Sequence, residues 1–188
     1  MLNLEFYKMS KYFLFLLLIC SETFVFSQFQ NKQLFEEVKR YENGKIKTII
    51  GLNEYDKREG ITYEYFPNGL LFRETSYVND KKEGMEITYF PNSVIESRGL
   101  FINDLAEGAF QYFYKNGKPF ATLVFQNNLL VTAKDCYTSK GEIVYCGPIN
   151  NGNGVFLKYD KKGNLISKDY YKNGVFQRSE HVEVNLKK

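Results

Sequence analysis

Apolar and polar residues alternate along most of the chain, in runs of about eight residues. In one such run Ile61, Tyr63 and Tyr65 alternate with Thr62 and Glu64. A period of two is typical of a β-strand that turns one face toward a core. No segment shows a convincing 3.6-residue period, which an amphipathic helix would require. The pattern therefore predicts an all-β protein.

Turn sequences separate these runs and occur in two series. The first comprises Phe66-Pro67-Asn68-Gly69, Phe90-Pro91-Asn92-Ser93, Tyr114-Lys115-Asn116-Gly117 and Asp160-Lys161-Lys162-Gly163. Proline and asparagine suit the centre of a type I turn, and the glycine takes the left-handed conformation that starts a bulged hairpin. Ser93 breaks this rule. The second series comprises Val78-Asn79-Asp80, Ile102-Asn103-Asp104, Gln126-Asn127-Asn128, Ile149-Asn150-Asn151 and Lys172-Asn173-Gly174.

The turns recur with a period of 24 residues, as does the pair Glu-Gly at 59–60, 83–84 and 107–108. Such a period is typical of a repeat protein whose units bury their apolar faces against each other. We expect an elongated, single-layer antiparallel β-meander with about twelve strands in about six hairpin repeats. The units are 37–60, 61–84, 85–108, 109–132, 133–154 and 155–178. A lead-in at 28–36 precedes this repeat domain, 37–178, and a polar tail at 179–188 follows it.

The repeat also aligns aromatic residues into two stripes across the predicted sheet. One is Tyr41, Tyr65, Tyr89, Phe113 and Tyr137, and the other is Tyr77, Phe101, Phe125 and the apolar Ile149. Either stripe could be core, but a single-layer sheet cannot bury both of its faces. Exposed tyrosine is enriched at binding surfaces. The candidate binding surface is therefore Tyr65, Tyr89, Phe113, Tyr137, Tyr77, Phe101 and Phe125.

The first 27 residues have the features of an export signal. Lys8 and Lys11 precede the apolar run 12–20, and Val25 and Ser27 suit a cleavage site between Ser27 and Gln28. Two alternatives are a lipoprotein acylated at Cys20, against which the bulky Ile19 speaks, and an uncleaved anchor. We expect export to the periplasm, the outer envelope or the medium.

Cleavage would leave two cysteines, Cys136 and Cys146, placed symmetrically about the turn residue Gly141. If that turn closes a hairpin, the two side chains face each other at a separation near disulfide reach. A disulfide and two buried thiols are both compatible with this pattern.

Residues for catalysis or cofactor binding do not form a recognisable set. The single histidine, His181, lies in the polar tail. Glu59, Glu83 and Glu107 recur beside the repeat glycine, which favours a structural role over an acid–base pair. A calcium ladder of Asn79, Asp80, Asn103, Asp104 and their counterparts is an alternative to their use as turn residues. We expect no enzyme, no cofactor and no metal. A net charge of +3 without a basic cluster argues against nucleic-acid binding.

The sequence resembles the MORN-repeat variant of bacterial proteins, and most closely the YwqK-type antitoxins. The resemblance lies in Glu-Gly followed by Tyr-Phe-Pro-Asn-Gly and Asn-Asp-Lys-Lys-Glu-Gly, at 59–69 and 78–84, then at 83–93 and 107–117, and weakly at 131–154. It implies an extended antiparallel sheet and no catalytic motif. It also implies toxin neutralisation, protein scaffolding or contact with membrane lipid.

We therefore expect a non-enzymatic, exported protein that binds another macromolecule along its sheet. The first candidate partner is a protein, in particular a toxin acting in the periplasm. Alternatives are a cell-envelope scaffold and a lipid-binding protein, and polysaccharide is a further candidate ligand. Units 109–154 are the expected footprint, because Thr132 stands there in place of the repeat glycine.

Overall fold

The computed structural model describes residues 35–182, which form thirteen strands and no helix. The strands are β1 (Phe35–Arg40), β2 (Ile46–Leu52), β3 (Gly60–Tyr65), β4 (Leu71–Val78), β5 (Lys81–Tyr89), β6 (Ile95–Ile102), β7 (Leu105–Phe113), β8 (Pro119–Gln126), β9 (Leu129–Lys134), β10 (Ile149–Asn150), β11 (Asn153–Tyr159), β12 (Leu165–Lys172) and β13 (Val175–His181). The predicted signal segment, with Cys20, Ser27 and Gln28, lies outside the described residues, as does the end of the tail. Within the described range, no helix is long and apolar enough to span a membrane.

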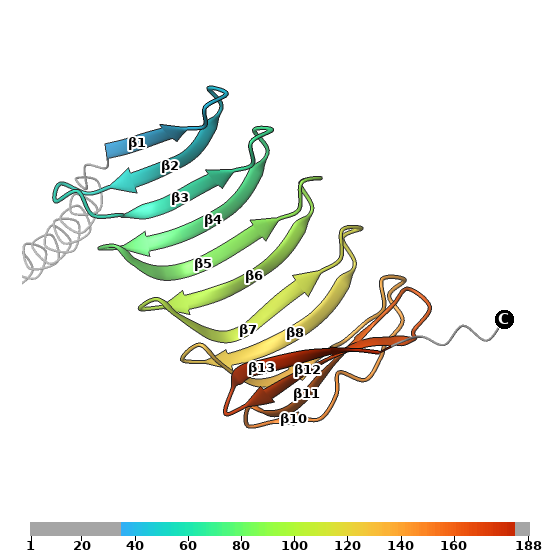
Figure 1. Ribbon diagram of the computed structural model, residues 1–188. Helices are drawn as coiled ribbons and strands as arrows, with labels where there is room; N and C mark the ends of the chain where they lie inside the picture. The colour runs from blue at the N-terminus through green and yellow to red at the C-terminus, as the bar shows by residue number, and fades with distance from the viewer. Residues whose placement is uncertain (1–34, 183–188) are drawn as a thin grey trace, which may run out of the picture. The chain divides into compact units, whose positions relative to one another are not determined.

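The strands form two antiparallel sheets rather than one (Figure 1). Nine strands pair in chain order from β1 to β9, and four more pair in chain order from β10 to β13. The predicted all-β meander is confirmed for the first nine strands. The prediction of one continuous single layer is wrong, because the chain leaves the first sheet after Lys134.

The first sheet ends where the fifth predicted unit, 133–154, loses the hairpin pattern. Asp135 has a φ of 51° directly after β9. The following turn contains an isolated bridge between Tyr137 and Ile143, not a pair of strands, and is closed by a hydrogen bond from the Thr138 amide to the Glu142 carbonyl. Gly147, with a φ of 97°, and Pro148 then redirect the chain into the two-residue strand β10. Proline also removes a donor that a continuing ladder would need. The chain therefore starts a second sheet instead of adding a tenth strand.

The second turn series consists of two-residue hairpin loops. Asn79 and Asp80 have φ values of 48° and 72°, and Asn103 and Asp104 have 49° and 69°. Two successive positive φ values define a type I′ turn, whose twist matches that of the flanking strands. Asparagine and aspartate tolerate this left-handed conformation better than other side-chain-bearing residues. These loops thus explain the recurring Asn-Asp pairs.

The first hairpin is one residue out of step with the others. The amide of Gly44 donates to the Tyr41 carbonyl, as that of Gly69 donates to the Phe66 carbonyl. Tyr41 is therefore the counterpart of Phe66, and Arg40 takes the place of Tyr65. The prediction that Tyr41 begins the Tyr65 stripe is wrong.

The main apolar core lies where the second sheet packs on the end of the first. Its buried members are Ala121, Leu130, Cys136, Cys146, Ile149 and Phe156, from β8, β9, the connecting loop, β10 and β11. Two glycine turns of the second sheet lie against β9. The amide of Gly152 donates to the Val131 carbonyl at 2.9 Å, and the amide of Leu130 donates to the Gly174 carbonyl at 3.1 Å. A Cβ atom on Gly174 would lie 2.6 Å from that of Leu129, so the approach requires glycine.

Alternation along the strands gives the first sheet two distinct faces. We call one the network face; its central column, in order of cross-strand pairing, is Glu64, Arg73, Thr88, Ser97 and Tyr112. We call the other the open face; its central column is Tyr63, Glu74, Ile87, Arg98 and Gln111. The second sheet covers the β8–β9 end of the network face, because Ala121 and Leu123 pack in the shared core.

Candidate functional site

One edge of the first sheet is crosslinked by the asparagines of the first turn series. The Nδ2 atom of Asn92 donates to the carbonyl of Lys115 at 2.9 Å, and that of Asn116 donates to the carbonyl of Ser139 at 2.8 Å. The Oδ1 atom of Asn116 meanwhile accepts from the amide of Lys118 in its own turn. Asn116 therefore accepts a hydrogen bond within its own turn and donates one to the next turn. This explains structurally why asparagine recurs at this position.

The opposite edge is crosslinked by the recurring glutamates. Glu59, Glu83 and Glu107 accept hydrogen bonds from the backbone amides of Asn79, Asn103 and Asn127, at 3.0, 2.8 and 2.9 Å. Asn153 does the same for Asn173 in the second sheet. A carboxylate that holds the amide of the Asn turn that follows the next strand has a structural use. This geometry favours the structural interpretation of these residues.

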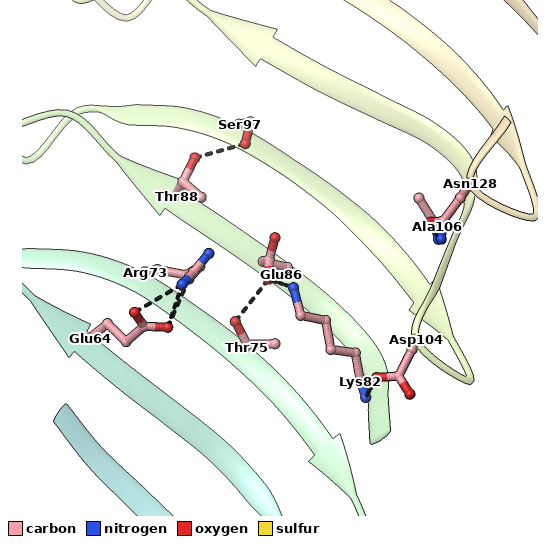
Figure 2. A network of polar contacts seen from close by, with 10 residues as sticks. All are labelled: Glu64, Arg73, Thr75, Lys82, Glu86, Thr88, Ser97, Asp104, Ala106 and Asn128. Atoms are coloured by element: carbon pink, nitrogen blue, oxygen red, sulfur yellow. Dashed lines mark hydrogen bonds and ion pairs between the residues drawn. The ribbon is translucent and has the colours of Figure 1, made fainter. Parts of the chain in front are cut away.

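The network face carries a belt of paired polar side chains on β3 to β6 (Figure 2). Arg73 donates to both carboxylate oxygens of Glu64, at 2.7 and 2.9 Å. Glu86 accepts from Thr75 at 3.0 Å and from Lys82 at 2.5 Å, and the Thr88 and Ser97 hydroxyls lie 2.7 Å apart. Because these charges are already satisfied by each other, the belt stabilises strand pairing and presents little free binding capacity.

Three of the seven predicted binding residues lie on this same network face and pack into it. Tyr77 is only 8% exposed, and the Arg58 guanidinium lies 4.1 Å from its ring centroid. The Phe110 ring, on β7, stands between Phe101 and Phe125, with centroid distances of 5.5 and 5.2 Å. The Tyr77–Phe101–Phe125 stripe therefore exists: Tyr77 is buried, and Phe101 and Phe125 are half-buried and pack against the Phe110 ring.

The other predicted stripe belongs to the open face as far as Phe113. The Tyr89 hydroxyl donates to Glu74 at 2.7 Å, and the Arg98 guanidinium lies 5.6 Å from the Phe113 ring centroid. Tyr65, Tyr89 and Phe113 are all half-buried. Tyr137 lies beyond the sheet in the loop after β9, where its carbonyl accepts from the Tyr114 hydroxyl.

Tyrosine ionisation on the open face is suppressed. Burial raises the pKa of Tyr89 to about 12, aided by the hydrogen bond to Glu74 and by the charge of that carboxylate. Burial, followed by Tyr63 and Glu74, also raises the pKa of Tyr65. Both hydroxyls therefore remain protonated at neutral pH, and that of Tyr89 donates to Glu74.

Large apolar side chains extend the open face and were not part of the predicted surface. Ile61 and Met85 are each 44% exposed and Leu100 is 39% exposed. Met85 and Leu100 are direct cross-strand partners. Their alternation with buried residues was visible in the sequence. What could not be read from the sequence is that the second sheet covers the β8–β9 end of the other face.

The remaining predicted positions are placed as follows. Cys136 and Cys146 form a disulfide with a Cα–Cα distance of 5.4 Å, inside the core between the two sheets. His181 ends β13 and is exposed. Among the described residues, no three histidine, cysteine, aspartate or glutamate side chains are grouped so that they could hold a metal ion.

Comparison with known families gives one result. Residues 58–79, 106–127 and 152–173 match the MORN repeat variant. Three segments of the chain are thus similar to this repeat. Each starts just before or within a repeat strand and ends at an Asn turn, so the match follows the hairpins seen in the structure. The third MORN repeat falls in the second sheet, and the disulfide loop lies between the second and the third. A search of curated proteins gives no match.

Proposed function

We propose that this chain is a non-enzymatic MORN-repeat protein that is exported and binds another protein through the open face of its first sheet. The single observation that carries the proposal is the composition of that face. On this face half-buried Tyr65, Tyr89 and Phe113 lie at one end of their strands, and exposed Ile61, Met85 and Leu100 lie toward the other end, while the opposite face of the sheet carries paired polar side chains or is covered. Rigid aromatic and methionine side chains are the types enriched at protein interfaces.

Neutralisation of a toxin is the specific form of this proposal, and export is part of it. The Cys136–Cys146 disulfide supports export, because disulfides persist mainly in oxidising compartments. The absence of an enzymatic role is also part of the proposal. It is supported by the recurring glutamates, each of which holds a turn amide.

The proposal is tested by capturing the partner with the tagged full chain expressed in its native host. Fractionation and intact mass first establish where the chain resides and whether its mature form starts at Gln28. The capture then compares the unaltered chain with the double variant Met85→Asp, Leu100→Asp. Two buried charges at an interface centre should reduce recovery of a specific partner at least about tenfold.

A matched control is Val175→Asp with Phe176→Asp, which changes two residues that are each 51% exposed on β13 of the second sheet. This control should recover the partner normally. Equal losses in both variants, or no specific protein with the unaltered chain, would contradict the proposal. Flotation of the purified chain with liposomes would instead indicate lipid binding.

A further inference from the structure

In two turns of the first series, the aromatic residue that starts the turn packs against a second aromatic ring. The Phe66 ring, at the start of one turn, packs on Phe72 six positions later with centroids 5.0 Å apart. Tyr114 packs on Phe120 in the same way, at 5.2 Å. The second ring of each pair lies on the strand that returns from the turn. It fills the space over the turn aromatic.

The hairpin between these two lacks the second ring. Phe90 starts its turn, but the residue six positions later is Glu96. The first hairpin shows the same kind of substitution, with Lys47 beside Tyr41, its Nζ 5.7 Å from the ring centroid. An open hollow is present at both of these turns, with volumes of about 510 Å³ beside Phe90 and about 480 Å³ beside Tyr41. The hollow beside Phe90 lies between that hairpin and the next one, because Tyr114 and Phe120 also line it.

The two hollows differ in chemistry. The one beside Tyr41 is lined by charged and polar residues as well, among them Arg40, Glu42 and Lys47. The one beside Phe90 is walled by four rings, those of Phe90, Phe113, Tyr114 and Phe120. Its volume falls within the range of about 300–1,000 Å³ that is usual for ligand pockets. We call it the Phe90 hollow.

The charge at the mouth of the Phe90 hollow is positive. Lys115 lines it and is exposed, with its Nζ 5.9 Å from the Phe90 ring centroid. No carboxylate is among its lining residues. Lys118 and Lys140 lie in the two adjoining turns, where the Lys118 ammonium group binds the Lys140 carbonyl. An occupant that brings a negative charge beside its ring therefore meets a complementary site.

We propose that the Phe90 hollow binds an aromatic side chain of the protein partner, from a segment that carries an acidic residue next to it. The partner's ring packs among the rings of Phe90, Phe113 and Phe120, and its carboxylate pairs with Lys115. This inference rests on the proposed function, because it states the chemistry by which a partner of the open face is recognised. Phe113 belongs both to the open face and to the wall of the hollow, so the two surfaces are continuous.

The experiment titrates the full chain with three peptides, acetylated and amidated at their ends: Gly-Phe-Asp-Gly, Gly-Phe-Lys-Gly and Gly-Ala-Asp-Gly. NMR signals of Phe90, Phe113 and Lys115 report binding. The Phe-Asp peptide should shift these signals saturably and bind up to about fivefold more tightly than the Phe-Lys peptide, the gain expected from one exposed ion pair. The Ala-Asp peptide should not saturate. Equal binding of all three peptides, or shifts confined to other residues, would overturn the inference.

Two variants and their matched controls complete the test. Glu96→Phe gives Phe90 the ring neighbour that Phe66 has, and should weaken the Phe-Asp peptide at least about fivefold by filling the hollow. Lys47→Phe makes the same change at the first hairpin and should leave binding unchanged. Lys115→Gln should remove the preference for the acidic peptide. Lys161→Gln, at the equivalent turn position of the second sheet, should not.

The same variants separate this inference from the proposed function. Suppose that Glu96→Phe captures the native partner as well as the unaltered chain does, while Met85→Asp with Leu100→Asp does not. The open face then binds the partner and the Phe90 hollow does not take part, so the inference fails alone. If both variants capture it normally, the proposed function fails as well.

Discussion

At the scale of the residue, the repeat encodes hydrogen bonds between neighbouring turns and within hairpins. The recurring glutamates and aspartates, and the asparagines of the first turn series, satisfy backbone groups at the sheet edges, as Glu83 does for the amide of Asn103. The sequence indicated a structural role for the glutamates but not their partners. Each carboxylate acceptor lies 20 residues before its amide donor in the sequence, and only the pairing of the strands brings the two together.

Tyr89 offers a prediction at this scale, because its pKa of about 12 depends on Glu74. The folded chain holds the Tyr89 proton more tightly than an unfolded chain, whose tyrosines titrate near 10. The stabilisation from this group is complete below about pH 10 and is lost as the pH rises to about 12. Glu74→Gln should lower the pKa of Tyr89, since it removes both the anionic acceptor and its charge.

The measurement is an NMR titration of the Tyr89 ring carbon in both proteins. Glu107→Gln serves as the control, because this carboxylate binds the amide of Asn127 instead. The same midpoint for Tyr89 in the unaltered chain and in Glu74→Gln would refute the assigned cause.

At the scale of the element, the turn chemistry predicts the hairpins, and packing decides where the sheet ends. Period-two runs and Asn or Gly turns are local signals, so strands β3 to β8 could be read from the sequence. The stop after Lys134 could not, because the chain turns away at Asp135 and Gly147, and the Gly152 and Gly174 turns then bond to β9 across a long sequence separation. For the same reason the covered and the open face could not be told apart in advance.

Gly99 supports a prediction about strand packing between β6 and β7. A Cβ atom on this residue would lie 2.2 Å from Cδ1 of Phe110, whose ring lies across the glycine. Gly99→Ala should therefore destabilise the fold by about 1–3 kcal/mol, as overpacking of a filled core does. The free energy of unfolding is measured with urea.

The matched measurement places the same change in a Phe110→Ala background. With the ring removed, the added methyl group has room, and Gly99→Ala should cost less than about 0.5 kcal/mol there. An equal cost in both backgrounds would show that the destabilisation comes from the backbone and not from the ring.

At the scale of the described unit, the nine-stranded sheet has two unlike ends. The end at β9 is joined to the second sheet by hydrogen bonds and a shared core. The other end is β1, which within the described part of the chain pairs only with β2. Between them hydrogen bonds join the turns of neighbouring hairpins, as those of Asn43, Asn92 and Asn116 do. Stability in such an array is approximately a sum of unit and interface terms.

The array should therefore accept another unit. A second copy of residues 61–84 inserted after Gly84 places Glu64 of the copy beside Arg73 of the original, which preserves the charge pairing of the network face. The sheet should lengthen by two strands, about 9.5 Å. Scattering measures the added length, and cooperative urea unfolding with a larger m-value shows that the added unit is folded.

A half unit is the control for this insertion. Inserting only residues 61–72 adds one strand, which reverses the direction of every strand that follows. This variant should fail to form the native fold. If it folded as well as the full-unit insertion, hairpin order would not be what holds the sheet together.

The 24-residue repeat also spaces equivalent side chains regularly across the open face. Equivalent side chains such as Tyr65 and Tyr89 recur every second strand, about 9.5 Å apart. Two turns of an α-helix advance about 10.8 Å, so a helix laid across the strands loses step with these rows after a few units. Three residues of polyproline II advance about 9.3 Å and stay in step. The spacing of these rows thus matches an extended segment with an anchor at every third residue better than it matches a helix.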